Sequence, residues 1–288
     1  MAARDSIAKG SKSFALASQL FDRRTRERAW LLYAWCRRCD DVADGQDHGG
    51  AMKPEGAATE RVAHIADLTT EALAGRPTGD PAFDALGQVA AEAAIPHHYA
   101  YDLIEGFALD AAGWHPRTEA DLLRYCYHVA GSVGCMMAVV MGVDPEDEPT
   151  MTAAADLGRA FQLANIARDL SEDDAAGRCY IPDDWLSELD ISPGEALRPH
   201  NRSRLAKVGW WLADMAQDHE ARARAGAKTL PFRSRWAVLA AAGIYGDIAR
   251  EVARRGASAW DRRVVVTPAA KAGWIAKAFG LALWRGPV

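Results

Sequence analysis

Two sets of polar residues lie far apart in the sequence, and each has the spacing of one helix face. In the first set, Tyr33, Arg37, Asp40 and Asp44 are separated by four, three and four residues. Residues three or four apart lie on the same side of a helix. Carboxylates at this spacing repel each other and weaken an isolated helix by roughly a few tenths of a kcal/mol per pair. The pattern therefore predicts a ladder of side chains that a cation would neutralise.

The second set, Gln162, Asn165, Asp169 and Asp173, is separated by three, four and four residues. Hard cations such as Mg²⁺ prefer oxygen ligands and usually take one or two carboxylates, several waters and substrate phosphates. Two ladders that face each other across a cavity would suit this chemistry. The alternative is a surface of ordinary salt bridges between neighbouring helical residues.

Arginines accompany both ladders. Arg37 and Arg168 each lie within one helical turn of the carboxylates. The planar guanidinium matches the oxygens of a phosphate group. The combination favours a phosphorylated ligand over a metal bound by protein alone.

Composition limits the class of protein. The 288-residue chain is 49% apolar and 25% charged, as is typical of globular proteins, and its net charge of −5 argues against nucleic acid as a partner. Residues 1–13 lack an apolar core of signal-peptide length. The most apolar runs are shorter than the roughly 20 residues that span a bilayer. We expect a soluble cytoplasmic protein that could contact a membrane at its surface.

Cysteines indicate neither a metal site nor a redox motif. Cys36 and Cys39 form a C-x-x-C pair, but no second pair or histidines follow at the spacing of a zinc site. A redox motif of this type would need a βαβ context. We interpret the five cysteines as reduced thiols, with this pair packed inside a helix.

Apolar residues recur with the 3.6-residue period of a helix, alanine is abundant, and alternating strand patterns are scarce. Asp80 before Pro81 and Thr118 before Glu119 are typical helix starts. Only 174–199 is expected to be irregular. The sequence predicts one all-α domain over 1–288, with helices near 6–19, 23–43, 57–74, 82–94, 97–111, 118–142, 151–173, 200–225, 232–255 and 267–283.

The sequence resembles the head-to-head prenyl synthases, the family of squalene, dehydrosqualene and phytoene synthases, and bacterial phytoene synthases in particular. The similarity extends from about Gly10 to the C-terminus and rests on five motifs in order. They are Gly10–Phe14, Leu32–Asp44, Tyr125–Gly134, Phe161–Asp169 and Gly177–Pro182.

This resemblance implies the all-α isoprenoid synthase fold, a helical bundle around a central cavity. It also implies head-to-head condensation of two geranylgeranyl diphosphates, through prephytoene diphosphate, to phytoene, the first committed step of carotenoid biosynthesis. The expected cofactor is Mg²⁺ or Mn²⁺, without NADPH. The expected partners are prenyl diphosphates, possible downstream carotenoid enzymes and a membrane surface that takes up the lipophilic product.

Site residues follow from the resemblance position by position. The implied metal ligands are Asp40, Asp44, Asn165, Asp169 and Asp173. The implied substrate-binding residues are Ser11, Ser13, Arg37, Tyr125, Ala130, Gly134, Gln162, Asn165, Arg168, Tyr245 and Arg263, with Arg262 as an alternative to the last. The implied catalytic residues are Tyr125, Arg37, Arg168, Asp40 and Asp169.

Several alternatives remain open at this point. A squalene or dehydrosqualene synthase would use farnesyl diphosphate, and a non-catalytic relative would serve as an assembly factor. A terpene cyclase shares the two-ladder chemistry but not the opening and central motifs. The small residues at Gly131, Gly134 and Ala138, with Met141, could line a tunnel or permit close helix packing. The apolar C-terminal helix could lie on a membrane or dock on the protein.

Overall fold

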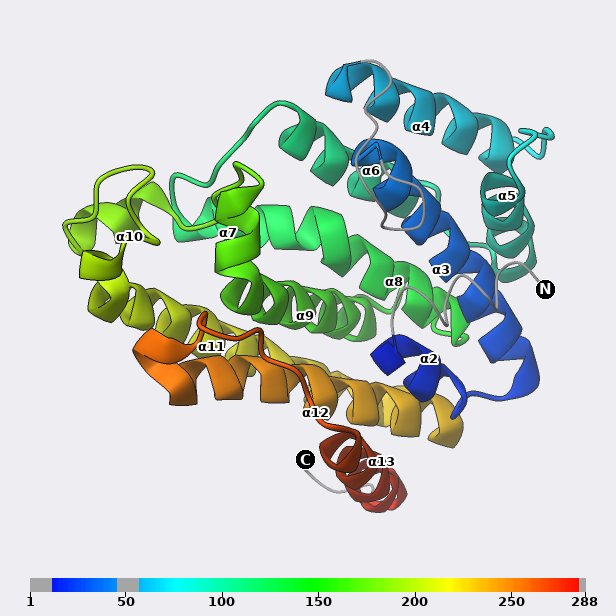
Figure 1. Ribbon diagram of the computed structural model, residues 1–288. Coiled ribbons are helices and arrows are strands. Elements are labelled where there is room, and N and C mark those ends of the chain that lie inside the picture. The colour runs from blue at the N-terminus through cyan, green and yellow to red at the C-terminus, as the bar shows by residue number, and fades with distance from the viewer. Residues whose placement is uncertain (1–11, 46–56, 285–288) are drawn as a thin grey trace.

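The computed structural model describes residues 12–45 and 57–284, and within these ranges the chain is helical and contains no β-strand. The all-α prediction is therefore confirmed, and the order of the helices is shown in Figure 1. They are α2 (Lys12–Ser18), α3 (Arg23–Ala43), α4 (Ala58–Leu73), α5 (Pro81–Ala93), α6 (His98–Ala111), α7 (Glu119–Cys126), α8 (Ser132–Val140), α9 (Glu148–Ala175), α10 (Asp183–Glu188), α11 (Arg202–Gly226), α12 (Phe232–Arg255) and α13 (Pro268–Leu283), with 3₁₀ turns at Pro199–Asn201, Ala227–Thr229 and Gly256–Ser258.

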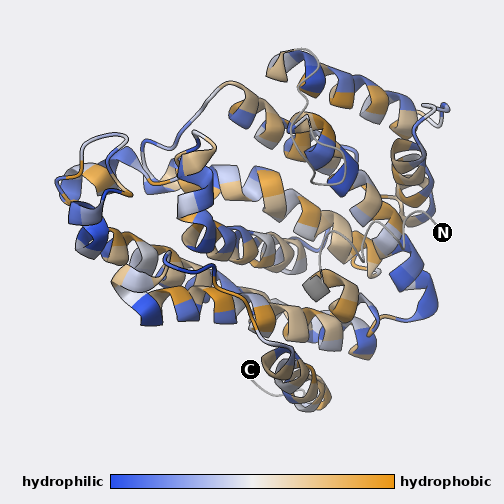
Figure 2. Cartoon of the chain, viewed as in Figure 1, coloured by the Kyte–Doolittle hydropathy of each residue, from blue (hydrophilic) through white to orange (hydrophobic). Residues whose placement is uncertain are grey.

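The long helix α9 lies at the centre of the molecule. It packs against α8 on one side and against α11 and α12 on the other, while α3 packs against α4, α5 and α8. Most helices carry alternating hydrophilic and hydrophobic stripes (Figure 2). This pattern is expected where one face is buried. The helices enclose a cavity of about 1100 Å³.

Capping residues set several helix starts where the sequence indicates them. The Asp80 side chain accepts a hydrogen bond from the Ala82 amide ahead of α5. Thr118 and Asp121 form a reciprocal capping box at α7. Such caps satisfy amide groups that have no partner within the helix. Both predicted starts are confirmed.

The central helix predicted over 118–142 contains a feature that periodicity did not reveal. Residues Tyr127–Gly131 form a π-helical turn between α7 and α8. This turn and α8 together cross α9 at very short range. A Cβ atom on Gly134 would lie 2.3 Å from the Ala154 carbonyl oxygen, and one on Gly158 would lie 2.2 Å from that of Ala130. Glycine is therefore required at this crossing.

The expectation of an irregular chain over 174–199 was wrong in part. A short helix, α10, forms within it, and its Trp185 and Leu186 are buried in the same apolar cluster as Leu163 of α9. Burial of these two side chains, rather than a periodic pattern, explains the helix, which is too short to give a clear period.

Cys36 and Cys39 lie in α3 as free thiols. Burial raises the pKa of the Cys36 thiol to about 12 and that of Cys39 well above its usual range. Both are therefore protonated at neutral pH, in agreement with the interpretation of packed thiols.

The C-terminal helix α13 is docked onto α12. The Trp274 indole donates a hydrogen bond to Asp247, and its ring lies against Gly243. Phe279, Leu283 and Trp284 stay exposed. Docking is thus confirmed, whereas contact of the exposed residues with a membrane stays a prediction. In the described ranges no helix has both the length and the apolar character needed to cross a bilayer.

The α8–α9 crossing gives a test of this packing. Gly158→Ala should destabilise the protein by about 1–3 kcal/mol, because the added methyl group meets backbone atoms that cannot move aside alone. Gly273→Ala is the control, since it lies in a helix with no atom within 4 Å of the added carbon and should be neutral or stabilising by up to about 1 kcal/mol. Thermal unfolding of the three proteins would measure both effects. Equal melting temperatures for wild type and Gly158→Ala would contradict the close approach.

Candidate active site

Both polar ladders line the same cavity. Asp40 and Asp44 lie at the C-terminal end of α3, and Asp169 and Asp173 lie near the end of α9. Arg178, in the loop that follows α9, forms an ion pair with Asp44 of α3. The loop thus connects the two ladders at the acidic end of the cavity.

Arginine pairs with the α3 ladder directly. One guanidinium nitrogen of Arg37 lies 2.9 Å from Asp40, and another lies 2.6 Å from the buried Asp41. The guanidinium group of Arg37 is held by two carboxylates, so its position beside the ladder is fixed.

The α9 ladder also has arginine partners. Arg168 forms a two-point ion pair with Asp169, and Arg263 from the segment before α13 lies 2.8 Å from the same carboxylate. Two guanidinium groups thus meet at one carboxylate that lines the cavity. Cations placed in this way could also bind an anion that enters beside Asp169.

Negative charge nevertheless remains in excess at this end of the cavity. Burial, together with the neighbouring Asp44 and Asp41, raises the pKa of Asp40 to about 6 even though Arg37 opposes the shift. Burial and the charge of Asp169 raise the pKa of Asp173 to about 7. A divalent cation would relieve this repulsion.

The carboxylates are not assembled into a complete metal cage. Among the described residues, no three side chains of histidine, cysteine or acidic type are grouped as metal ligands. The ladders instead offer one or two carboxylates each, which fits a cation that takes its remaining ligands from water and substrate phosphate. The donor set therefore fits Mg²⁺ or Mn²⁺ together with a phosphorylated ligand.

Nearly all of the predicted site residues line this single cavity. Ser11 lies outside the described residues, and only the backbone of Ser13, in α2, is described. Both Arg262 and Arg263 are exposed, but only Arg263 is among the described residues that line the cavity. The predicted residues that line the cavity are Arg37, Asp40, Asp44, Tyr125, Ala130, Gly134, Gln162, Asn165, Arg168, Asp169, Asp173, Tyr245 and Arg263.

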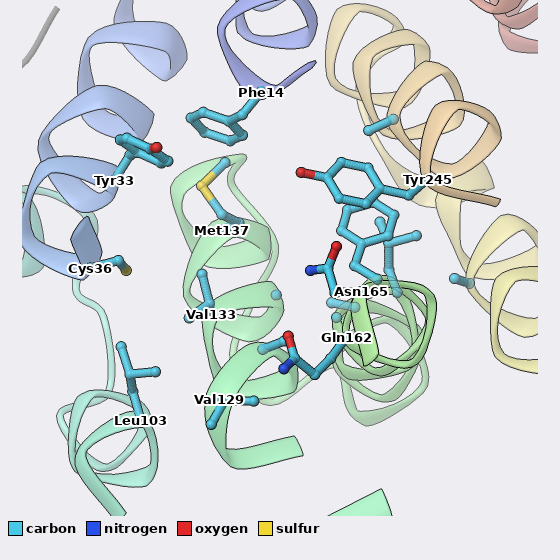
Figure 3. A pocket seen from close by; sticks show the side chains of 18 of the residues that line it. Phe14, Tyr33, Cys36, Leu103, Val129, Val133, Met137, Gln162, Asn165 and Tyr245 are labelled. Carbon is cyan, nitrogen blue, oxygen red and sulfur yellow. The ribbon is translucent and has the colours of Figure 1, made fainter. Parts of the chain in front are cut away.

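Away from the acidic end the cavity is lined mainly by apolar and aromatic side chains, with Gln162 as a polar exception. Figure 3 shows Tyr33 of α3 and Val133 and Met137 of α8 on one side, with Gln162 and Tyr245 on the other. Gly134, Ala138 and Met141 also line this part, while Gly131 packs against Tyr127 and the backbone of α9. The small residues therefore serve both predicted purposes, since they bring α8 and α9 together and leave room beside them.

Three charged or polar residues of the site were missed in the sequence. Arg178 and Tyr180 follow the second ladder within the Gly177–Pro182 motif, but no role was assigned to them. Asp110, at the end of α6, accepts hydrogen bonds from the hydroxyls of Tyr125 and Tyr180. A carboxylate at the end of an otherwise apolar helix face is the signal that could have identified it.

Comparison with known proteins gives the family. The model of the squalene/phytoene synthase family matches residues 7–270. A phytoene synthase of Pseudescherichia vulneris is 46% identical over 263 residues, covering 91% of this chain and 84% of that protein. A 15-cis-phytoene synthase of Pantoea ananas is 43% identical over 281 residues, which cover 97% of this chain and 90% of that protein. The chain belongs to the squalene/phytoene synthase family.

Solved structures agree with the fold. A dehydrosqualene synthase in complex with a ligand superposes with a TM-score of 0.85 at 26% identity, covering 97% of this chain and 95% of that one. The squalene synthase HpnC of Alicyclobacillus acidocaldarius has a TM-score of 0.75 at 23% identity, and the match covers 88% of this chain and 93% of that one. The predicted isoprenoid synthase fold is therefore confirmed.

The raised pKa of Asp173 predicts a pH-dependent cost in stability. Because its folded-state pKa is about 7, above the usual value near 4, the protein loses stability as pH rises between these values. Without divalent cation, Asp173→Asn should melt a few degrees above wild type at pH 8 and close to it at pH 5. Asp174→Asn, one residue along and exposed, should change neither value. The measurement is the difference in melting temperature between Asp173→Asn and wild type at each pH. If this difference is the same at pH 8 and at pH 5, the proposed repulsion at Asp173 is wrong.

Proposed function

We propose that this protein is a phytoene synthase, which condenses two geranylgeranyl diphosphates head to head and converts the product, prephytoene diphosphate, to phytoene. The observation that carries this proposal is one cavity with two carboxylate–arginine ladders at one end and apolar walls beyond them. The polar end suits diphosphate, and the apolar walls suit prenyl chains. The phytoene synthases of related sequence support the choice of substrate within the family.

The proposed metal site consists of the two carboxylate pairs. Asp40 and Asp44 would hold Mg²⁺ or Mn²⁺ from α3, and Asp169 and Asp173 would hold it from α9, with Asn165 as a further oxygen ligand. The bound cation would supply the Lewis-acid charge that makes diphosphate a leaving group. No redox cofactor is needed, because phytoene formation ends in loss of a proton rather than in reduction.

The arginines of the site bind and orient the diphosphate in this proposal. Arg37, Arg168 and Arg263 are already held beside the cavity by carboxylates. Fixed cations of this kind stabilise the charge that develops on the leaving group without a large reorganisation. Ser11, Ser13 and Gln162 complete the proposed substrate contacts.

Aromatic and apolar side chains protect the allylic cation in the proposed reaction. Phe14 stacks on Tyr33 with ring centroids 5.0 Å apart, and Phe161 stacks on Tyr245 at 4.1 Å. All four residues line the cavity. Aromatic faces attract cations, and the apolar walls exclude the water that would convert the cation to an alcohol.

We also infer that the chain forms one catalytic domain. The cavity is lined by residues from Phe14 in α2 to Arg263 after α12. Both ladders and the aromatic walls are complete only when α2, α3, α9 and α12 come together.

Product analysis tests the proposed function. Purified protein with Mg²⁺, without NADPH, should form a C40 hydrocarbon from geranylgeranyl diphosphate, and EDTA should abolish the reaction. A C30 hydrocarbon formed from farnesyl diphosphate alone would identify a dehydrosqualene synthase and contradict the proposed substrate. Absence of product from either substrate, with or without NADPH, would favour a non-catalytic assembly role.

The ladders predict the effect of single amide substitutions. Asp40→Asn or Asp169→Asn should reduce turnover by at least about 10²-fold, since each removes a charged group from the diphosphate end. Circular dichroism should show unchanged helix content. Asp174→Asn, on the same helix as Asp169 but exposed, is the matched control and should retain wild-type activity. Near-normal turnover of either ladder variant with Mg²⁺ would refute the proposed metal site.

A further inference from the structure

Asp110 holds two tyrosine hydroxyls at the acidic end of the cavity. Tyr125 donates to one carboxylate oxygen at 2.9 Å, and Tyr180 donates to the other at 2.9 Å. All three residues line the cavity. In the described part of the chain, Asp110 is a cavity carboxylate whose hydrogen-bond partners are neutral phenols, and no arginine lies within ion-pair distance of it.

The phenol oxygens are held in place by stacking. The Tyr125 ring lies between Trp114, at a centroid distance of 5.5 Å, and Tyr180, at 4.8 Å with an angle of 22° between the rings. Tyr125 and Tyr180 are 3% and 5% exposed. The hydroxyl of Tyr125 is therefore held against Asp110 at the wall of the cavity.

The environment makes Asp110 a better proton acceptor than an exposed carboxylate. Burial raises its pKa, and the two phenol hydrogen bonds only partly oppose this shift. Burial also raises the pKa of Tyr125 well above its usual range, so the phenol is neutral at physiological pH. A neutral phenol bonded to a carboxylate can take up one proton while it passes its own proton on.

The proposed reaction needs such an acceptor, because it releases a proton when the cyclopropane forms and a second when phytoene forms. The carboxylates of the two ladders are less suited to this step. Asp40, Asp44 and Asp169 are engaged by arginines, and all the ladder carboxylates would be engaged by cations in the proposed site. Asp110 is close enough to the acidic end for its pKa to be affected by Arg178 and Asp44, yet no ion pair joins it to Arg178.

We propose that Asp110 is the proton acceptor behind Tyr125. As the C–H bond of the carbocation breaks, its electron pair forms the new carbon–carbon bond and its proton adds to the Tyr125 oxygen. The phenol's own proton moves to Oδ2 of Asp110, which becomes a neutral carboxylic acid and returns the proton to water after the products leave. Tyr180 positions the other carboxylate oxygen. This inference rests on the proposed function.

Asp110→Asn tests the relay, because it keeps the size of the side chain and removes the basic oxygen. We expect kcat to fall by about 10²–10⁴-fold, the usual contribution of a general base. KM for geranylgeranyl diphosphate and the Mg²⁺-dependent affinity for inorganic pyrophosphate should change less than about threefold. Adding Tyr125→Phe should cause little further loss, since the two residues act as a unit.

The chain offers a matched control on the same helix. Asp102 of α6 accepts a hydrogen bond from the Tyr127 hydroxyl at 2.8 Å, and neither residue is among the described residues that line the cavity. Asp102→Asn thus removes an equivalent phenol–carboxylate bond away from the reaction and should retain kcat within about threefold. Asp110→Glu, which restores the carboxylate, should be more active than Asp110→Asn.

Three results would overturn the relay. They are equal kcat values for the Asp110→Asn and Asp102→Asn variants, a loss of pyrophosphate affinity as large as the loss of kcat, and additive effects of the Asp110 and Tyr125 substitutions. If Asp110→Asn does not fold, an Asp110→Glu variant that folds but is as inactive as Tyr125→Phe also overturns it. Failure of wild type to form phytoene in the same assay would instead reject the proposed function.

Discussion

Repulsion among carboxylates at one end of the cavity is the constraint on which the rest of the site depends. The α3 and α9 ladders bring several negative charges into a partly buried space, where the pKa of Asp40 rises to about 6 and that of Asp173 to about 7. Arginines from four segments of the chain offset part of this charge, and among them Arg178 joins the loop after α9 to α3. The same guanidinium groups are then in place for a diphosphate. This repulsion lowers the stability of the folded protein at neutral pH. In return, the site is ready to bind cations, which neutralise the carboxylates, together with the phosphate oxygens of a ligand.

The shape of the cavity depends on a second constraint, the close contact between α8 and α9. Gly134 and Gly158 bring the two backbones within a distance that no other residue allows. The π-helical turn before α8 lies beside this contact, and π turns are common at functional sites. Close packing here fixes the helix that carries the second ladder against the helix that follows Tyr125. The small side chains that make the contact also leave space for apolar chains.

Much of this arrangement could be predicted from the sequence, because ladders at helical spacing and helix caps are local signals. Asp40, Asp169 and Tyr125 were expected to share a site, and they line one cavity. The remaining features depend on tertiary contacts. Asp110 has no polar neighbour at helical spacing, and its role is visible only once α6 meets Tyr125 and Tyr180. The helix α10 forms because Trp185 is buried, which no short periodic pattern reveals. The choice of Arg263 over Arg262 rests on the tertiary structure, in which Arg263 lines the cavity and pairs with Asp169.

Calorimetric titration with inorganic pyrophosphate tests the central claim most directly, because it measures the charge balance without chemistry. The account predicts that pyrophosphate binds tightly only when Mg²⁺ is present, and that Mg²⁺ binds more tightly when pyrophosphate is present, by the same factor. Asp40→Asn and Asp169→Asn should each weaken this mutual dependence. Pyrophosphate that binds equally well in EDTA would show that the arginines alone form the anion site, and the proposed role of the carboxylate ladders would be wrong.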